Sequence, residues 1–171
     1  MANANELLGP VLRDVSRSFY LTLRIIPSSV RRQIALAYLL ARTTDTIADT
    51  ELVPPELRIE KLRQFRERIR YTDALPVEFE ELIHHQENHA ERVILERSHE
   101  SLGLLDEISP VDRGQIQFVL ETITRGQELD LKRFGDGQQL RALETQVELD
   151  DYTYRVAGCV GEFWTRMTRT H

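Results

Sequence analysis

The chain has 171 residues, of which 41% are hydrophobic and 29% are charged, and its formal net charge is −6 at pH 7. This length predicts one domain with a substantial core, and the acidic balance argues against a broad nucleic-acid surface. The single cysteine, Cys159, excludes an intramolecular disulfide and a cysteine zinc cluster. The longest apolar run, 34–41, is far shorter than the ~20 residues of a membrane-spanning helix, and residues 1–5 lack a secretion signal. We therefore expect a soluble, cytoplasmic globular domain.

Hydrophobic residues recur at helical spacing along almost the whole chain, and no segment shows the alternation of a convincing strand. The pattern predicts helices over about 6–24 with a break near 16–18, then over 30–50, from 54–55 onward, from Pro76 into 84–91, over 90–105, over 110–134, and, after a loop at 135–137, from Gln139 to the end. Pro27 with Ser28 and Ser29 is expected to end the first helix and cap the second, and Ser109 with Pro110 to start the sixth. The sequence therefore predicts an all-α fold.

The last predicted helix carries an apolar stripe almost to its final residue, and no glycine, proline or polar tail follows it. Helices more often close with such a stop signal. We therefore expect residues 1–171 to form a single all-α domain that is the N-terminal part of a longer one.

The sharpest chemical pattern lies in the second predicted helix. Tyr38, Arg42, Asp45 and Asp49 stand at relative positions 0, 4, 7 and 11, which fall on one narrow face of a helix. Two carboxylates four residues apart on a buried face repel each other, and a divalent cation relieves that repulsion. Magnesium fits because it is commonly shared between carboxylates and a substrate phosphate, which Arg42 is suited to grip. The competing interpretation is a solvated face with an Arg42–Asp45 or Arg42–Asp49 ion pair.

Two further stretches have features of a binding site. Ser16, Arg17 and Ser18 lie near the expected helix break, where hydroxyls, a guanidinium and free N–H groups can cradle a phosphate, although such triplets are also common capping sequence. Gly158 and Gly161 lie inside a helical run and each costs about 1 kcal/mol relative to alanine. A helix that retains them needs close approach by another helix or by a ligand, and the sequence leaves these two alternatives open.

Other candidates are weaker. His85 and His89 stand four residues apart, but Gln86 occupies the position where a zincin helix needs glutamate. We therefore expect His84, Glu87 and Glu91 to form a solvated polar face. Cys159 lies in an apolar stripe and is expected to pack there.

Four stretches, in this order, resemble the squalene/phytoene synthase family of head-to-head prenyl transferases. They are SRSF at 16–19, YLLARTTDTIAD at 38–49, GQELDL at 126–131 and YTYRVAGCVG at 152–161. The resemblance runs from residue 16 to the end of the chain and implies an isoprenoid-synthase-type helical bundle around a central cavity, without its C-terminal part. It also implies that two prenyl diphosphates, with farnesyl diphosphate as the expected substrate, join to a squalene- or phytoene-type product with Mg²⁺-assisted loss of diphosphate.

The same resemblance assigns roles to individual residues. Asp45 and Asp49 are expected to hold Mg²⁺ against a substrate diphosphate, and Tyr152 is expected close to the reacting carbons as a catalytic residue. The implied substrate-binding residues are Ser16, Arg17, Ser18, Phe19, Tyr38, Arg42, Val156, Ala157 and Gly161. Within that set, Arg17, Ser18 and Arg42 contact the diphosphate, Tyr38 lines the diphosphate side, and Val156, Ala157 and Gly161 shape the prenyl channel.

The chain departs from the family pattern in two ways. Ala48 stands where many relatives carry a further acidic residue inside the first motif. The family's second aspartate-rich helix lies downstream of the VAGxVG stretch, and the sequence ends at His171 before reaching it; Asp150 and Asp151 lie on the other side of Tyr152 with the wrong spacing. A magnesium site with one of its two carboxylate walls is expected to be weak. We therefore expect the 171-residue chain by itself to show little or no turnover.

Two other functions are compatible with these motifs. One is another class I terpenoid synthase, although such enzymes usually carry DDxxD, whereas Thr44 precedes Asp45 here. The other is a non-catalytic helical partner that binds prenyl diphosphate or stabilises an active paralogue, which would suit Ala48 and the missing second motif. The expected cofactor is Mg²⁺, with NADPH in addition if the product is squalene. We expect a prenyl diphosphate partner, no nucleic acid, and peripheral membrane contact for product release; the exact product, the prenyl chain length and the oligomeric state stay open.

Overall fold

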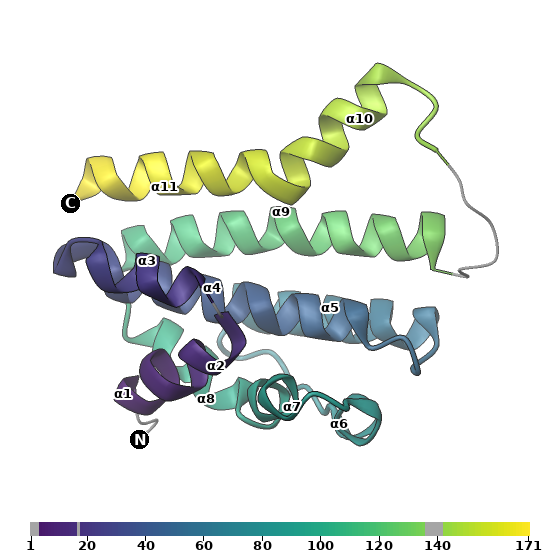
Figure 1. Ribbon diagram of the computed structural model, residues 1–171, viewed down its shortest axis with the longest axis horizontal. Coiled ribbons are helices and arrows are strands. Elements are labelled where there is room, and N and C mark those ends of the chain that lie inside the picture. Colours follow the sequence, from purple (N-terminus) through teal and green to yellow (C-terminus); the bar gives the residue numbers. More distant parts are fainter. Residues whose placement is uncertain (1–3, 17, 136–141) are drawn as a thin grey trace.

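All regular structure in the described part of the chain is helical (Figure 1), which confirms the all-α prediction. The computed structural model describes residues 4–16, 18–135 and 142–171. The elements are α1 (Ala4–Glu6), a π-helical turn η1 (Leu7–Val11), α2 (Leu12–Ser16), α3 (Phe19–Ile25), α4 (Ser28–Asp49), α5 (Pro55–Arg70), α6 (Glu80–His85), α7 (His89–Glu96), α8 (Ser98–Asp106), α9 (Pro110–Phe134), α10 (Gln146–Thr153), a second π-helical turn η2 (Tyr154–Gly158) and α11 (Cys159–Thr170). None of these helices is both long and apolar enough to cross a membrane.

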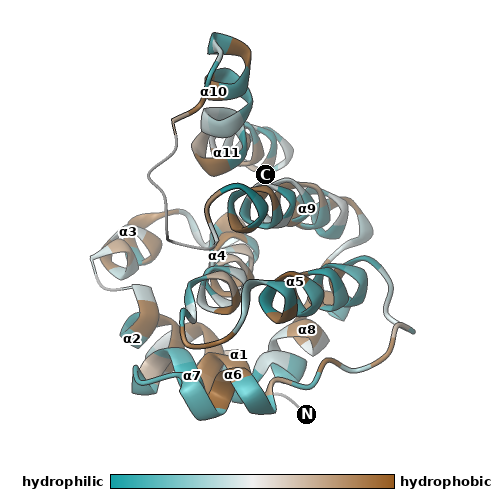
Figure 2. Cartoon of the chain, turned by 90° about the vertical axis from the view of Figure 1, so that its right-hand side faces the viewer, coloured by the Kyte–Doolittle hydropathy of each residue, from teal (hydrophilic) through white to brown (hydrophobic). Residues whose placement is uncertain are grey.

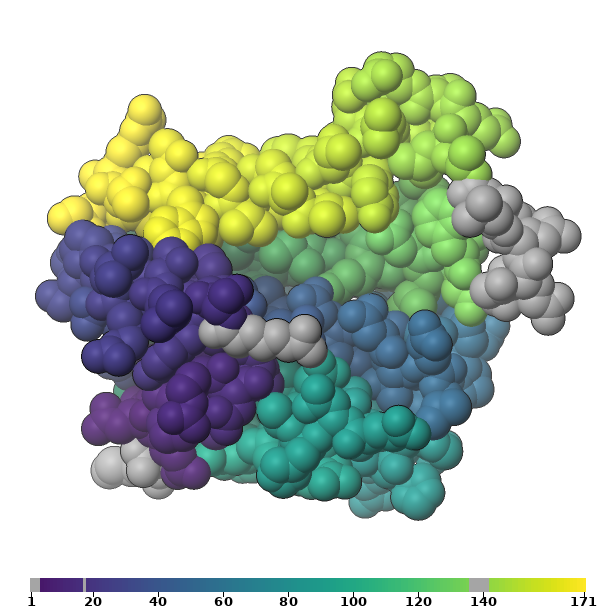
Figure 3. Space-filling model, viewed as in Figure 1, coloured from purple at the N-terminus to yellow at the C-terminus, as the bar shows by residue number. Residues whose placement is uncertain are grey.

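The long helix α4 lies at the centre of the molecule. It packs against α5, α7, α8 and α9, while α11 lies mainly on α9. Figure 2, which looks along the long helices, shows α4 surrounded by α3, α5, α7 and α9. In Figure 3 the yellow and yellow-green atoms of 142–171 form the upper edge of the molecule. The C-terminal helices therefore form an outer layer, whereas α4 is enclosed.

The sequence of α4 explains its central position. Its apolar residues, among them Ile34, Leu36 and Ile47, are buried on several sides of the helix. Thr43 and Thr44 are buried too, and each hydroxyl donates to a carbonyl one turn earlier in the same helix, at 3.0 and 2.8 Å. Their polar groups are thus satisfied without water. Only one stripe of the C-terminal half of α4 remains accessible.

Several predicted helix boundaries are confirmed. The first predicted helix breaks between α2 and α3, at the expected place, although Arg17 lies outside the described residues. Ser109 caps α9 by accepting a hydrogen bond from the Asp112 N–H at 3.2 Å, with Pro110 as the first helical residue. The expected cap of α4 is wrong. Pro27 is its N-cap residue and Ser28 is already helical, and no side chain caps this end.

Two predicted helices differ from the structure at points where distant parts of the chain make contact. No helix starts at Pro76, since residues 75–79 have no regular secondary structure, and Phe79 is buried with its ring 5.9 Å from that of Phe65. The helix predicted over 90–105 divides at Arg97, whose guanidinium donates to Glu6 at 2.6 Å and so ties this point to α1.

The last predicted helix also begins later than expected. Its predicted start near Gln139 lies outside the described residues, as does most of the loop at 135–137. The structure has α10 begin at Gln146, after a capping box in which Thr145 and Glu148 each bond the other's backbone N–H.

Candidate active site

The accessible stripe of α4 carries the four polar residues that the sequence singled out. Tyr38, Arg42 and Asp45 are half-buried and Asp49 is exposed, while the positions between them are largely buried. The four residues therefore share one face, as their spacing predicts. The expectation of a buried carboxylate pair is wrong, because the Asp45 side chain is 40% exposed and the face opens onto two hollows.

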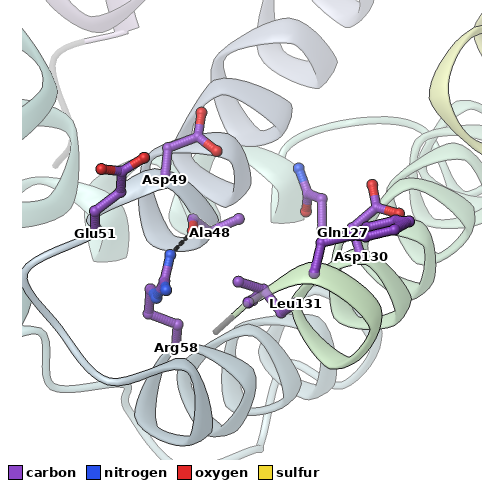
Figure 4. Close-up of a pocket in the computed structure, with 9 residues that line it drawn as sticks. Ala48, Asp49, Glu51, Arg58, Gln127, Asp130 and Leu131 are labelled. Atoms are coloured by element: carbon purple, nitrogen blue, oxygen red, sulfur yellow. Dashed lines mark hydrogen bonds between the residues drawn. The ribbon is translucent and has the colours of Figure 1, made fainter. Parts of the chain in front are cut away.

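The first hollow is a polar groove of about 640 Å³ between the C-terminal end of α4, α5 and α9 (Figure 4). It is lined by Ala48, Asp49, Glu51, Arg58, Gln127, Asp130, Leu131, Phe134 and Gly135. Asp49 and Glu51 lie on one side and Asp130 on the other. Arg58 is buried and donates from Nη1 to the carbonyl of Ala48 at 2.5 Å, which caps the end of α4. The groove thus brings three carboxylates and one cation together.

The second hollow is an apolar cavity of about 260 Å³ between α3, α4, α9, η2 and α11. It is lined by Phe19, Ile34, Ala37, Tyr38, Ala41, Asp45, Val119, Ile123, Val156, Val160, Phe163 and Trp164. Asp45 is the one charged residue in this lining, and the rings of Phe19 and Tyr38 stack with their centroids 4.5 Å apart. Since Asp45 borders the cavity and Asp49 borders the groove one turn later, the carboxylate pair joins an apolar hollow to a polar one.

The positive charge near Asp45 and Asp49 does not offset the effect of burial on their carboxylates. Asp45 accepts a hydrogen bond from Gln127 Nε2 at 2.6 Å and a long one from Arg42 Nη1 at 3.4 Å. Burial nevertheless raises the pKa of Asp45 above its ordinary value. Burial also raises the pKa of Asp49, and the charge of Glu91 adds to that rise although Arg42 opposes it. A bound cation would stabilise both ionised forms.

The residues of the groove fit a magnesium ion. Two buried oxygens, Gln127 Oε1 and Asp130 Oδ1, have no hydrogen-bond partner among the described residues and belong to side chains that line it. In the described part of the chain, no three His, Cys, Asp or Glu side chains gather closely enough to enclose a metal by themselves. Magnesium does not require this, because it typically keeps several waters and takes substrate phosphate oxygens beside one or two carboxylates. Asp49 in the groove and Asp45 one turn earlier, at the border of the cavity, are therefore suitable protein ligands.

Arg42 has a partner that the sequence did not predict. Its Nη2 donates to Glu91 Oε1 on α7 at 2.6 Å. The expected solvated face is confirmed at His84 and Glu87, which are exposed, and is wrong at Glu91, because α7 packs against α4 and leaves this side chain only 18% exposed. Neither competing ion pair within α4 is the main one, since Arg42 reaches Asp45 only at 3.4 Å.

The other N-terminal candidates occupy different surroundings. Ser16 is buried and its Oγ has no hydrogen-bond partner within the described residues, whereas Ser18 is exposed at the N-terminal end of α3. Arg17 lies outside the described residues. Phe19 and Tyr38 line the apolar cavity. The structure therefore brings Phe19, Tyr38 and Asp45 together directly, while the two serines lie elsewhere.

The C-terminal candidates are only partly brought to the cavity. Val156 lines it, but Ala157 and Gly161 are exposed and lie outside the linings of both hollows. Tyr152 is half-buried on α10 and is likewise absent from both linings. Within the described chain, the predicted channel wall therefore consists of Val156 with the apolar residues of α11.

The close approach expected at the glycines lies elsewhere. A Cβ added to Gly161 would meet open space, and at Gly158 it would meet the Tyr154 ring of the same helical run at 3.1 Å. At Gly126 on α9, however, an added Cβ would lie 2.9 Å from the Cβ of Arg155. Tight packing between α9 and η2 therefore depends on Gly126, in the GQELDL stretch.

The sequence did not identify Gln127, Asp130 and Arg58 as site residues. Gln127 and Asp130 stand three residues apart, which places them on one face of α9, but this spacing is common in helices. Arg58 carried no signal at all, because a lone arginine in a charged helix is ordinary. Only the packing of α4 against α5 and α9 reveals the three together.

Comparison with known proteins agrees with this geometry. A model of the squalene/phytoene synthase family matches residues 12–171. The chain belongs to the squalene/phytoene synthase family. It is 27% identical over 161 residues to the bifunctional lycopene cyclase/phytoene synthase of Blakeslea trispora, covering 92% of this chain and 24% of that protein. It is 28% identical over 163 residues to the squalene synthase of Yarrowia lipolytica, covering 92% of this chain and 34% of that protein.

Solved structures share the fold of this squalene/phytoene synthase family member. TcSQS in complex with the ligand E5700 superposes with a TM-score of 0.75 at 24% identity, over 98% of this chain and 44% of that one. The chain spans about a third of the length of the squalene synthase from Yarrowia lipolytica and about a quarter of the bifunctional enzyme.

Proposed function

We propose that this chain carries one metal-binding face and part of the prenyl channel of a head-to-head prenyl synthase. The reaction is the condensation of two prenyl diphosphates, of the farnesyl class, to a squalene- or phytoene-type hydrocarbon with loss of diphosphate. The observation that carries this proposal is the position of Asp45 and Asp49, one helical turn apart, between an apolar cavity and a polar groove. A prenyl diphosphate has the same two parts, an apolar tail and an anionic head.

The side chains around this pair suit such a substrate. Asp45 and Asp49 would hold Mg²⁺, and the ion when bound neutralises charge on the leaving diphosphate. Gln127 fixes the orientation of Asp45 through its hydrogen bond of 2.6 Å. Arg42 offers a guanidinium to diphosphate oxygens.

The walls of the cavity have a separate task. The departure of diphosphate leaves an allylic cation, which reacts with water unless water is excluded. Phe19, Val156 and Trp164 line the cavity and provide an apolar wall for the prenyl chain. The assignment of Tyr152 to the neighbourhood of the reacting carbons is supported by its motif alone. NADPH use and peripheral membrane contact on the cytoplasmic side also belong to the proposal for a squalene-type product.

The protein contains its own probe for a binding test. Trp164 is the single tryptophan and lines the apolar cavity. We would titrate the chain with farnesyl thiolodiphosphate, a non-hydrolysable analogue, and follow Trp164 fluorescence with and without Mg²⁺. Farnesol and inorganic diphosphate serve as the tail and the head alone. We expect Mg²⁺ to strengthen binding of the thiolodiphosphate and to leave that of farnesol unchanged; equal binding with and without Mg²⁺ would contradict the proposal.

A turnover assay separates binding from catalysis. The purified chain is incubated with farnesyl diphosphate, Mg²⁺ and NADPH, and hydrocarbon products are extracted and analysed by mass. We expect binding with little or no product, because no three His, Cys, Asp or Glu side chains of the described residues gather closely enough to enclose a metal. Robust turnover would overturn that expectation, and binding without turnover in a chain extended to the full family length would favour the non-catalytic partner.

A further inference from the structure

Arg42 lies between two carboxylates and binds them unequally. Its Nη2 is 2.6 Å from Glu91 Oε1, whereas its Nη1 is 3.4 Å from Asp45 Oδ2. The first distance is that of a strong charge-assisted hydrogen bond, and the second is at the outer limit of any hydrogen bond. The guanidinium is therefore held towards α7 and away from the carboxylate that borders the apolar cavity.

Glu91 is well fixed at its own end. Asn88 caps α7, and its Oδ1 accepts from the N–H groups of Ala90 and Glu91 at 2.9 and 3.3 Å. Ile94 and Leu95, one turn further on, are buried in the core. The backbone that carries Glu91 is thus anchored by a cap on one side and by packing on the other, so its carboxylate is a fixed partner for Arg42.

Removal of the Glu91 charge would leave Arg42 with one nearby carboxylate. Arg42 is only 24% exposed, and its Nε is buried with no partner in the described part of the chain, so its guanidinium has little access to water. The closest remaining carboxylate is that of Asp45, three residues later on the same helix. An i, i+3 ion pair forms readily on a helix, and it would occupy the Asp45 oxygen that faces Arg42.

We propose that Glu91 is a positioning residue, which draws the Arg42 guanidinium towards α7 and thereby leaves the Asp45 carboxylate open to a divalent cation. The inference rests on the proposed function, since it takes Asp45 as a cation ligand. It gives a role to a residue outside the DxxxD motif, on a helix that contributes nothing to the lining of the groove or of the cavity.

The test measures the Mg²⁺ concentration at half-saturation of farnesyl thiolodiphosphate binding, read from Trp164 fluorescence. Glu91→Gln keeps the size of the side chain and removes its charge. Glu96→Gln makes the same change at an exposed position of α7 and is the control. We expect Glu91→Gln to need about tenfold more Mg²⁺, as the loss of one charge-assisted hydrogen bond implies. Glu96→Gln and the binding of farnesol should be unchanged.

A double-mutant cycle distinguishes positioning from a general structural role. In an Arg42→Gln background, Glu91→Gln should cause no further rise in the Mg²⁺ concentration at half-saturation, because Glu91 acts through Arg42. A tenfold rise in that Mg²⁺ concentration in both backgrounds, or an equal loss of farnesol affinity, would overturn the inference. Either result would indicate that Glu91 only supports the fold.

A ligand-free measurement separates this inference from the proposed function. The ¹⁵N resonances of the Arg42 guanidinium are recorded in the wild type, in Glu91→Gln and in Glu91→Gln/Asp45→Asn. We expect Glu91→Gln to shift them and the added Asp45→Asn to shift them again, since Arg42 then loses its new partner. Unchanged resonances overturn the positioning role whatever the ligand result. If the variants show the expected shifts but the wild type shows no Mg²⁺-dependent binding, the positioning role of Glu91 is supported and the proposed function is rejected.

Discussion

The polar stripe of α4 and the segment formed by η2 and α11 both contribute residues to the lining of the apolar cavity, yet they differ in how far the described chain surrounds them. Asp45 is bonded to Gln127 on α9, and its neighbour Arg42 to Glu91 on α7. In contrast, Val156 is 54% exposed, and Gly161 has open space where a side chain would be. The difference teaches that the side chains of a motif are held by partners on other helices. The α4 site has such partners on α7 and α9, whereas α11 packs mainly on α9.

The largest effect is expected from a substitution in the accessible stripe of α4. Asp45→Asn should weaken Mg²⁺-dependent binding of farnesyl thiolodiphosphate by about 100-fold, because it removes a charged ligand of the ion. The variant should melt no lower than the wild type, since burial already raises the pKa of the carboxyl that it replaces. Calorimetric titration and thermal melting measure both quantities. Asp150→Asn, at an exposed carboxyl of α10, is the control, and an equal loss there would point to a nonspecific charge effect.

The second effect concerns the attachment of α9, which carries the far wall of the groove. Glu128 on α9 is buried and receives hydrogen bonds from Arg63, Lys132 and Arg66, which lower the pKa of its carboxyl to about 2 although burial opposes them. Glu128→Gln should reduce the free energy of unfolding at pH 7 by about 2 kcal/mol, because it leaves these cations without their counter-charge. Chemical denaturation of both proteins measures the difference.

The pH dependence of that difference is a second check. Because the folded pKa of Glu128 is lowered, its contribution is complete above its ordinary value of 4.5 and is lost as the pH falls towards about 2. The gap between wild type and Glu128→Gln should therefore narrow as the solution is acidified through this range. A gap that stays constant down to pH ~2 would show that the carboxylate charge is not its cause.

The third effect compares two helical glycines directly. Gly126→Ala should destabilise the fold by about 1 kcal/mol, because the new Cβ would lie 2.9 Å from that of Arg155 and force α9 and η2 apart. Gly161→Ala meets open space and should stabilise the helix by up to about 1 kcal/mol through helix propensity. Thermal melting of both variants decides the sign. If both substitutions shift the melting temperature in the same direction, the contrast between the packed surroundings of Gly126 and the open surroundings of Gly161 is wrong.

The smallest effect is expected at the border of the open region. Val156→Ser should weaken the binding of farnesol and of farnesyl thiolodiphosphate about threefold alike, because Val156 lines the cavity but is half exposed. Ala157→Ser changes a neighbouring residue outside the cavity lining and should leave both affinities unchanged. Trp164 fluorescence measures all four affinities. A loss confined to the thiolodiphosphate would place Val156 at the head of the substrate instead of its tail.

Local patterns predicted much of this molecule. Helical periodicity located α4, α5 and α9 to within a few residues, and the Ser109–Pro110 cap was predicted from sequence alone. The break at Arg97 was not, because it depends on a bond to Glu6, which lies far away in the sequence. In the same way, Glu91 and Gln127 reach the stripe across separations of 49 and 82 residues, which no spacing rule covers.

By itself, the sequence determined the all-α character of the chain and the common face of Tyr38, Arg42, Asp45 and Asp49, because both follow from the helical period of 3.6 residues. Its motifs in order also indicated the family, which the match over residues 12–171 shows. Only the tertiary structure decided that this face opens between an apolar cavity and a polar groove and that Arg42 turns towards Glu91. The physical reason is that side chains are oriented by charges and packing on other helices, and these neighbours are chosen by the fold and not by local spacing.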